Sequence, residues 1–166
     1  MMIPQIKKIL YATDLSKNSE YAFYYSVDLA KKYGSEIVIL HAVEPLSTRA
    51  FGTHTDKVYH GQQKESLEVI RNRLQKFCEI VEEKNSLACV NLVTKTIVEV
   101  GYPAEEILKA ADGEGCDVIV LGTHGKGFLR HAFLGSVSRS VLERARKPVF
   151  TVPLPSETTS IWDEMK

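Results

Sequence analysis

A parallel β-sheet with α-helices on both faces is the fold class that this 166-residue sequence predicts. Two nearly continuous apolar runs, EIVILHAV at 36–43 and DVIVLGT at 117–123, are typical of strands covered on both sides. Segments of strand character also alternate about five times with segments of helical periodicity, which favours parallel strands joined by helical crossovers. Because no internal repeat is visible, we expect one domain.

Composition and charge exclude several classes of protein. Basic and acidic residues balance at 21 each, so bulk charge gives no indication of a nucleic-acid or membrane-surface protein. No segment approaches the roughly 20 apolar residues of a membrane span, and the apolar stretch at the N-terminus is too short for a signal peptide. Cys78, Cys89 and Cys116 are far apart and odd in number, which favours reduced thiols over disulfides or zinc ligands. We therefore expect a cytoplasmic protein.

The first elements follow the alternation closely. The run KKILYATD at 7–14 predicts a short strand that ends at an acid. A helical pattern follows from about Ser19 to Tyr33, and Gly34 supplies a stop signal. The apolar run at 36–43 predicts the second strand.

The clearest helix of the sequence is expected at 64–84, and Asn85 can terminate it. Its apolar positions recur at spacings of three and four residues, at Leu67, Ile70, Leu74, Phe77 and Val81. Residues 44–60 before it show no clear period. That length is unusual for a connection in a compact domain, so this segment is either a functional loop or lid or a disordered insertion.

The second half continues the same pattern. Pro103 suits the first turn of a short helix, and Gly113 and Gly115 suit its end. The tail at 155–166 has no assignable pattern, so the expected single domain covers 1–154. The remaining predicted elements are strands at 87–98, 117–123 and 147–153 and a helix from Ser136 to Ala145.

The loop LGTHGKGFLRHAFLGS at 121–136 carries four glycines. Glycine costs backbone entropy unless the chain needs an unusual dihedral or a close approach, so this loop predicts main chain held against a ligand. Gly135 and Ser136 begin a helix whose free N–H groups and positive dipole end form an anion site. Ligands of open α/β sheets bind beyond the carboxyl ends of the strands, where both this loop and Asp14 are expected. Segment 118–142 has no acidic residue, and its basic residues are Lys126, Arg130 and Arg139.

Two familiar phosphate-binding motifs do not fit this loop. The pattern GxxxxGK[ST] needs a glycine at Val120 and a hydroxyl residue at Gly127. The pattern GxGxxG fails because Arg130 occupies its last glycine position, and no acid ends the following strand to hold a ribose. A P-loop hydrolase and an NAD enzyme are therefore both poor interpretations.

The glycine spacing resembles that of another family. Gly122, two residues, Gly125, nine residues and then Gly135-Ser136 is similar to the G-x2-G-x9-G-[S/T] signature of the ATP-binding branch of the universal stress proteins. The resemblance covers nearly the whole chain and includes KKILYATDLS, VILHAV, CDVIVLGTHG and GSVSRSVLERARKPVFTVP. It implies a three-layer, open twisted five-stranded parallel sheet of order 3-2-1-4-5, Rossmann-like and of the adenine nucleotide alpha hydrolase type.

The same resemblance implies a homodimer that binds ATP, AMP or ADP between strands one and four, with or without Mg²⁺. Asp14 would meet the adenosine, Ala42 would line the adenine pocket, and the glycines with Ser136 would cradle ribose and phosphates. Family members often carry proline where Ala12 stands. The implied binding residues are Ala12, Thr13, Asp14, Ala42, Gly122, Thr123, Gly125, Lys126, Gly135, Ser136 and Val137.

Purely structural roles compete with these assignments. Asp14 can cap the helix that follows it, and Ser136 can cap the next one. His124 and His131 are interpreted as polar loop residues, and His41 as a satisfied core histidine. The apolar strand at 147–153 would form an open sheet edge, which pairing with a second copy would cover.

Three functions remain open at this point. The first is a regulatory stress protein that binds ATP and meets an unknown protein partner, with no catalytic residues. The second is a slow ATPase or a nucleotidyl or phosphoryl transferase that uses the same pocket. The third is a nucleotide-free dimer, against which the intact glycine signature argues.

Overall fold

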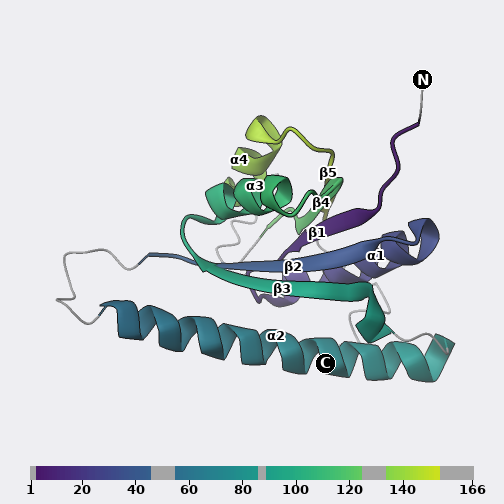
Figure 1. Cartoon of the computed structure of the whole chain (residues 1–166), viewed down its shortest axis with the longest axis horizontal. Helices are drawn as coiled ribbons and strands as arrows, with labels where there is room; N and C mark the ends of the chain where they lie inside the picture. Colours follow the sequence, from purple (N-terminus) through teal and green to yellow (C-terminus); the bar gives the residue numbers. More distant parts are fainter. Residues whose placement is uncertain (1–2, 46–54, 86–88, 125–133, 154–166) are drawn as a thin grey trace.

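The computed structural model describes residues 3–45, 55–85, 89–124 and 134–153. Within them, five parallel strands form one sheet in the order β3-β2-β1-β4-β5, as the resemblance implied (Figure 1). The strands are β1 (Lys8–Ala12), β2 (Glu36–Val43), β3 (Val93–Val100), β4 (Val118–Gly122) and β5 (Val149–Val152). The helices are α1 (Lys17–Tyr33), α2 (Thr55–Asn85), the 3-10 helix η1 (Cys89–Leu92), α3 (Pro103–Gly113) and α4 (Ser136–Arg144).

The sheet is the middle of three layers, with α1 and α2 on one face and α3 and α4 on the other (Figure 1). Successive residues of a strand point to opposite faces, so the strands divide their side chains between two cores. Ile9 and Tyr11 of β1 belong to the core under α1 and α2, whereas Leu10 and Ala12 belong to the core under α3 and α4. Helices on both faces explain why the predicted strands are almost continuously apolar.

Helix α1 begins and ends on the signals that the sequence carries. Ser16 is its N-cap residue, and its side chain accepts a hydrogen bond from the backbone N–H of Ser19. Gly34 is its C-cap residue, with φ of 65°, and its N–H donates to the carbonyl of Ala30. Only glycine adopts that left-handed conformation without a steric cost, so the predicted stop at Gly34 is confirmed.

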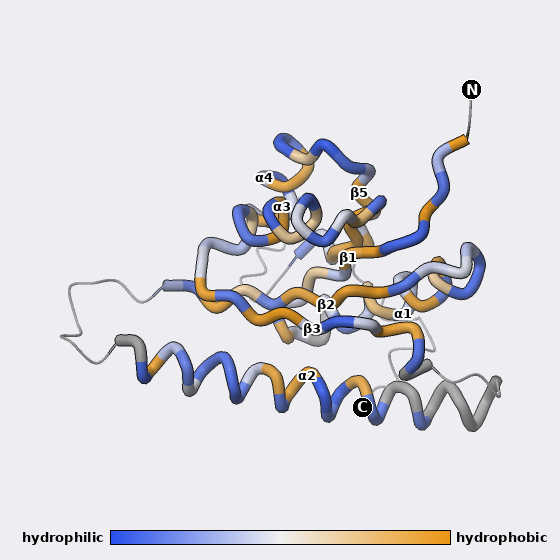
Figure 2. Tube along the Cα trace, viewed as in Figure 1, coloured by the Kyte–Doolittle hydropathy of each residue, from blue (hydrophilic) through white to orange (hydrophobic). Residues whose placement is uncertain are grey.

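Helix α2 is longer than the periodicity predicted, because it begins at Thr55. The unpatterned segment at 44–60 therefore contains the first turns of this helix, and its interpretation as a loop is wrong from Thr55 onward. Lys57, Val58 and His60 are exposed in these turns and Tyr59 is only half-buried, so the described side chains produce no apolar period. Figure 2 shows α2 as mostly hydrophilic against the hydrophobic strands. Residues 46–54 lie outside the described part of the chain.

The strand expected at 87–98 is shifted. Residues Cys89–Leu92 form η1, and the strand runs from Val93 to Val100. β3 forms one edge of the sheet, where half-exposed residues such as Thr94 and Lys95 weaken the pattern that marks a strand.

The remaining elements agree with the sequence. α3 begins at Pro103, and Gly115 just beyond it has φ of 64°. β4, α4 and β5 fall within the predicted ranges, each shorter by a few residues. Cys116 is a buried free thiol whose pKa is raised to about 11 by its burial. The tail at 155–166 lies outside the described residues.

No helix within the described part of the chain combines the length and the apolar character that crossing a membrane requires.

Candidate functional site

The carboxyl ends of β1, β2 and β4 lie side by side at one edge of the sheet. Ala12, the last residue of β1, pairs with Leu40 of β2, and Tyr11 pairs with Val120 of β4. The strand order reverses at β1, because β2 lies on one side of it and β4 on the other. Open α/β sheets bind ligands at such a switch point, beyond the carboxyl ends of the strands. The predicted site residues at the ends of β1 and β4 therefore lie at the same end of two neighbouring strands.

Asp14 lies in the turn after β1 and supports the start of α1 through Ser16. Its Oδ1 accepts hydrogen bonds from the backbone N–H of Ser16, at 3.0 Å, and from the Ser16 hydroxyl. The capping interpretation of Asp14 is therefore correct only in part, because Ser16 is the N-cap residue and Asp14 holds it in place. An ionised carboxylate offers about four acceptor positions, so this role is compatible with accepting a ligand hydroxyl as well.

Thr13 is held from several directions. Its N–H donates to the carbonyl of Leu40 at 2.9 Å, and its Oγ1 accepts from the N–H of Leu15 at 3.0 Å. The same Oγ1 lies 2.9 Å from the hydroxyl of Ser19 in α1. His41 lies with Nδ1 2.8 Å from the Thr13 carbonyl, and since a carbonyl only accepts, Nδ1 carries the proton. Hydrogen bonds thus join the end of β1 both to β2 and to α1.

Leu15 has an unusual backbone conformation. Its φ of 62° is the one positive value among the non-glycine residues that the structure describes. The left-handed region costs an L-residue roughly 1–2 kcal/mol, which surrounding contacts must offset. Leu15 directly follows Asp14 in the chain. The position of the Asp14 carboxylate therefore depends on the contacts that stabilise the left-handed conformation of Leu15.

The end of β4 and the start of α4 approach each other closely. The N–H of Gly135 donates to the carbonyl of Thr123 at 2.7 Å. A Cβ at position 135 would lie 3.2 Å from that oxygen and 3.6 Å from the Cα of His124. Gly135 is therefore required here by a close approach of backbone to backbone. That the glycine loop holds main chain against a ligand stays a prediction.

Helix α4 begins at the same edge without a capping side chain. Gly135 is its N-cap residue, and no side chain in the described part of the chain caps its first turn. The N–H of Arg139 makes the first return bond, to the Gly135 carbonyl at 3.0 Å. Ser136 is exposed and Val137 half-buried. Free N–H groups at a helix start, together with the helix dipole, attract an anion.

The predicted site residues that the structure describes divide into two groups. The structure places Ala12, Thr13 and Asp14 at the end of β1 and Ala42 in β2, two residues beyond the partner of Ala12. Gly122, Thr123, Gly135, Ser136 and Val137 lie at the end of β4 and the start of α4. Gly125, Lys126 and His131 lie outside the described residues.

Three residues that support this edge were not assigned a role there from the sequence. Ser138 donates its hydroxyl to the carbonyl of Gly122 at 2.8 Å, which joins α4 to the end of β4. His41 is 7% exposed and bonded to Thr13, so its interpretation as a satisfied core histidine is confirmed. Arg73 reaches the turn after β1 from α2, 58 residues away in sequence, and no local pattern could indicate that contact.

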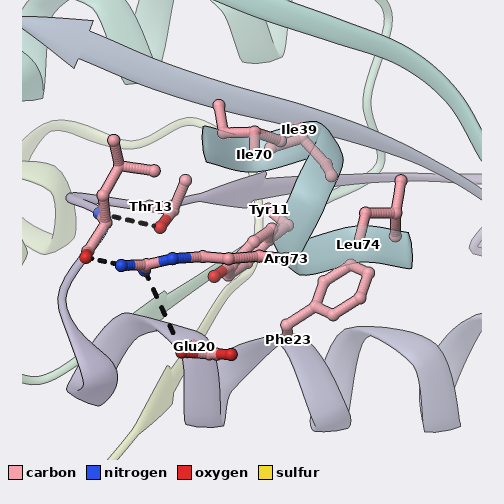
Figure 3. A pocket seen from close by; sticks show the side chains of 9 residues that line it. Tyr11, Thr13, Glu20, Phe23, Ile39, Ile70, Arg73 and Leu74 are labelled. Atoms are coloured by element: carbon pink, nitrogen blue, oxygen red, sulfur yellow. Dashed lines mark hydrogen bonds and ion pairs between the residues drawn. The ribbon is translucent and has the colours of Figure 1, made fainter. Parts of the chain in front are cut away.

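Beside the turn after β1 lies a small hollow of about 40 Å³ between β1, α1 and α2 (Figure 3). The side chains of Phe23, Ile39 and Leu74 form its apolar wall. Arg73 extends across its mouth, with Nη1 2.7 Å from the Leu15 carbonyl and 3.9 Å from a carboxylate oxygen of Glu20. Arg73 of α2 thus reaches the turn with a charged side chain, and Leu15 and Leu74 also line this hollow.

Tyr11 stabilises the base of this hollow. Its buried hydroxyl donates to the carbonyl of Ser19 at 2.7 Å. Burial raises the pKa of Tyr11 far above its ordinary value, so the phenol stays protonated and keeps donating. β1 and the start of α1 are therefore joined beneath the site.

No group of three or more His, Cys, Asp or Glu side chains that could hold a metal ion occurs among the residues that the structure describes.

A family model for the universal stress protein family matches residues 5–153. Universal stress protein MJ0577 of Methanocaldococcus jannaschii is 32% identical over 154 residues, which cover 88% of this chain and 94% of that protein. The solved structure of MJ0577 superposes with a TM-score of 0.62 at 28% identity and covers 93% of this chain and all of that one.

A second solved structure has the same fold. It is the universal stress protein from Archaeoglobus fulgidus in complex with dAMP, with a TM-score of 0.51 and 20% identity. The alignment covers 90% of this chain and 98% of that one.

Proposed function

This chain belongs to the universal stress protein family, and on that premise we propose that it binds an adenine nucleotide, first of all ATP, at the switch point between β1 and β4. The proposal depends on one observation. The turn after β1 and the start of α4, which no side chain in the described part of the chain caps, both lie at the carboxyl end of the neighbouring strands β1 and β4. The turn supplies the carboxylate of Asp14, and the start of α4 supplies the backbone N–H groups of its first turn.

These two features suit the two ends of a nucleotide. A carboxylate accepts hydrogen bonds from the hydroxyls of a ribose, as it does in other nucleotide-binding α/β folds. A helix start attracts phosphate through its N–H groups and its dipole. Gly135 and Ser136 lie at that helix start, and Gly122 lies at the end of the neighbouring strand, in agreement with the signature spacing.

The adenine would lie toward β2. Ala42 follows His41 in β2, on the side of β1 away from β4. A base there would contact main chain and small side chains, which favours adenine recognition through the backbone. The nucleotide complex of the Archaeoglobus fulgidus relative is an adenine mononucleotide as well.

A binding function has more support than catalysis. Asp14 already holds the Ser16 hydroxyl and N–H, and the nearby His41 donates to a backbone carbonyl. These hydrogen bonds give Asp14 and His41 a positioning role at the site. We therefore propose a regulatory protein whose nucleotide state changes its interaction with partners.

We also propose a homodimer through β5. This short strand is an edge of the sheet, and its Phe150 is 39% exposed beside Tyr25. Pairing with a second copy would cover both the open edge and this aromatic pair.

The direct test is nucleotide release and rebinding. Heat-denatured protein should release adenine nucleotide in near-stoichiometric amount, and the stripped chain should bind ATP in calorimetry with and without Mg²⁺. Gly125→Val should abolish that binding, because a side chain in the signature would occupy phosphate space. An absence of both bound nucleotide and ATP binding would overturn the proposal, whereas ADP production that disappears in Gly125→Val would favour the ATPase.

A further inference from the structure

We propose that Arg73 is a positioning residue of the nucleotide site, which makes α2 and the bound nucleotide depend on each other. This inference rests on the proposed function. It starts from the left-handed Leu15, the residue that directly follows Asp14.

The backbone carbonyl of Leu15, in the turn after β1, accepts a hydrogen bond from α2. Inside the turn, the Leu15 N–H donates to Thr13 Oγ1, and the Leu15 carbonyl is bonded outside the turn, to Arg73 of α2. Nη1 of Arg73 donates to this oxygen at 2.7 Å. A hydrogen bond from a charged donor is roughly twice as strong as a neutral one, so this contact can offset the steric cost of the left-handed conformation.

Glu20 of α1 orients the guanidinium. Its carboxylate lies 3.9 Å from Nη1 of Arg73, and both side chains are about one-third exposed. At that exposure the ion pair itself contributes little to stability. Its effect is on orientation. A guanidinium already held by Glu20 loses less side-chain conformational entropy when it bonds to the Leu15 carbonyl.

In its described part, helix α2 buries few side chains, and Leu74 packs partly buried against the core beside Ile70. Its 31 residues span about 46 Å, whereas the eight residues of β3 beside it span about 26 Å. Among its described side chains only Ser66 and Ile70 are buried, and Gln63 adds one bond to the Val98 carbonyl. Where few side chains are buried a helix opens locally at low free energy, so the charged contact to the turn helps to hold this part of α2 in place.

Coupling between α2 and the nucleotide follows. A nucleotide that binds Asp14 favours the ordered turn, and the ordered turn presents the carbonyl that Arg73 requires. By thermodynamic linkage, docking of α2 must then favour the nucleotide by the same factor. On this proposal, the stability of α2 against local opening depends on whether a nucleotide is bound.

The experiment compares three variants of the full chain. Arg73→Met keeps the apolar stem and removes every donor, whereas Arg73→Lys keeps one charged donor. Arg71→Met is the matched control, an exposed arginine of the same helix. ATP affinity is measured by calorimetry, thermal unfolding by circular dichroism, and hydrogen exchange of α2 with and without ATP.

We expect Arg73→Met to weaken ATP binding about tenfold, Arg73→Lys to recover part of that loss, and Arg71→Met to bind like the original chain. ATP should slow exchange in α2 of the original chain and fail to do so in Arg73→Met, although both unfold at similar temperatures. This exchange readout in the original chain needs no variant to fold.

Unchanged ATP affinity in Arg73→Met, or equal losses in Arg71→Met, would overturn the inference and leave the nucleotide site standing. Exchange in α2 that ATP does not alter in the original chain would do the same. An original chain that binds no adenine nucleotide would instead overturn the proposed function, and the inference with it.

Discussion

The hydroxyl of Ser138 donates a 2.8 Å hydrogen bond to the carbonyl oxygen of Gly122, 16 residues earlier in the chain. This contact fixes the first turn of α4 against the last residue of β4. The N–H of Gly135 adds a second connection, to the Thr123 carbonyl. The end of β4 and the start of α4 are thus joined by two hydrogen bonds.

A side chain at Gly135 should disturb this unit. In Gly135→Val the new Cβ would lie 3.2 Å from the Thr123 oxygen, so α4 must shift away from the end of β4. We expect ATP affinity to fall about tenfold or more, a change of about 1.4 kcal/mol or above, in titration calorimetry. Gly113→Ala is the control, because a Cβ there meets nothing within 4 Å. Equal affinities in both variants would contradict this geometry.

Asp14 should affect binding and stability separately. Asp14→Asn keeps an oxygen that accepts from Ser16 but loses the negative charge, so it should unfold like the original chain and bind ATP about tenfold more weakly. Asp14→Ala also loses the acceptor for the Ser16 N–H and hydroxyl, and should be destabilised by about 1–2 kcal/mol in urea unfolding. If Asp14→Asn binds ATP with full affinity, the carboxylate has only its structural role.

Phe150 should influence the oligomeric state. Its ring lies 5.9 Å from that of Tyr25, on the open edge strand β5. We expect the original chain to sediment as a dimer at micromolar concentration and Phe150→Lys to shift toward monomer, because a buried charge disfavours the pairing. Tyr102→Lys, at an exposed aromatic position at the start of α3, should remain dimeric. A monomeric original chain would refute the proposed dimer.

The pair of Glu105 and Arg144 should make α3–α4 packing depend on pH. Arg144 donates to both carboxylate oxygens of Glu105, at 2.6 and 2.8 Å, and this holds the pKa of Glu105 below its ordinary value. Stabilisation from a lowered pKa is present above the ordinary value of about 4.3 and is lost as the pH falls through the folded-state pKa.

Thermal unfolding of Glu105→Gln should therefore occur below that of the original chain at pH 7, and the difference should shrink in acid and at high salt. Glu143→Gln, at another exposed glutamate of this region, is the control. A difference that stays constant from pH 7 to pH 3 would show that the ion pair is not its cause.

Gly61 tests the early start of α2. It is an exposed glycine inside the helix, and a Cβ there meets nothing within 4 Å. Because alanine is the better helix former, Gly61→Ala should raise the free energy of unfolding by about 0.5–1 kcal/mol. A loss of stability would mean that residues 55–63 are not helical in solution.

The sequence by itself determined most of the framework. Buried strands of a parallel sheet are apolar on both faces, so β2 and β4 stand out, and Ser16, Gly34 and Pro103 mark helix ends through strictly local chemistry. The glycine spacing likewise predicts which residues approach a ligand, because glycine leaves the main chain accessible, and this stays a prediction.

Only the tertiary structure decided how the site is held together. The first turns of α2 carry no apolar period, since most of their described side chains are exposed or half-buried, and their helical state could not be predicted from the sequence. The bonds from Arg73 to Leu15, from His41 to Thr13 and from Ser138 to Gly122 join residues 58, 28 and 16 positions apart. Such contacts arise from the packing of whole elements on the sheet, and no local pattern in the chain encodes them.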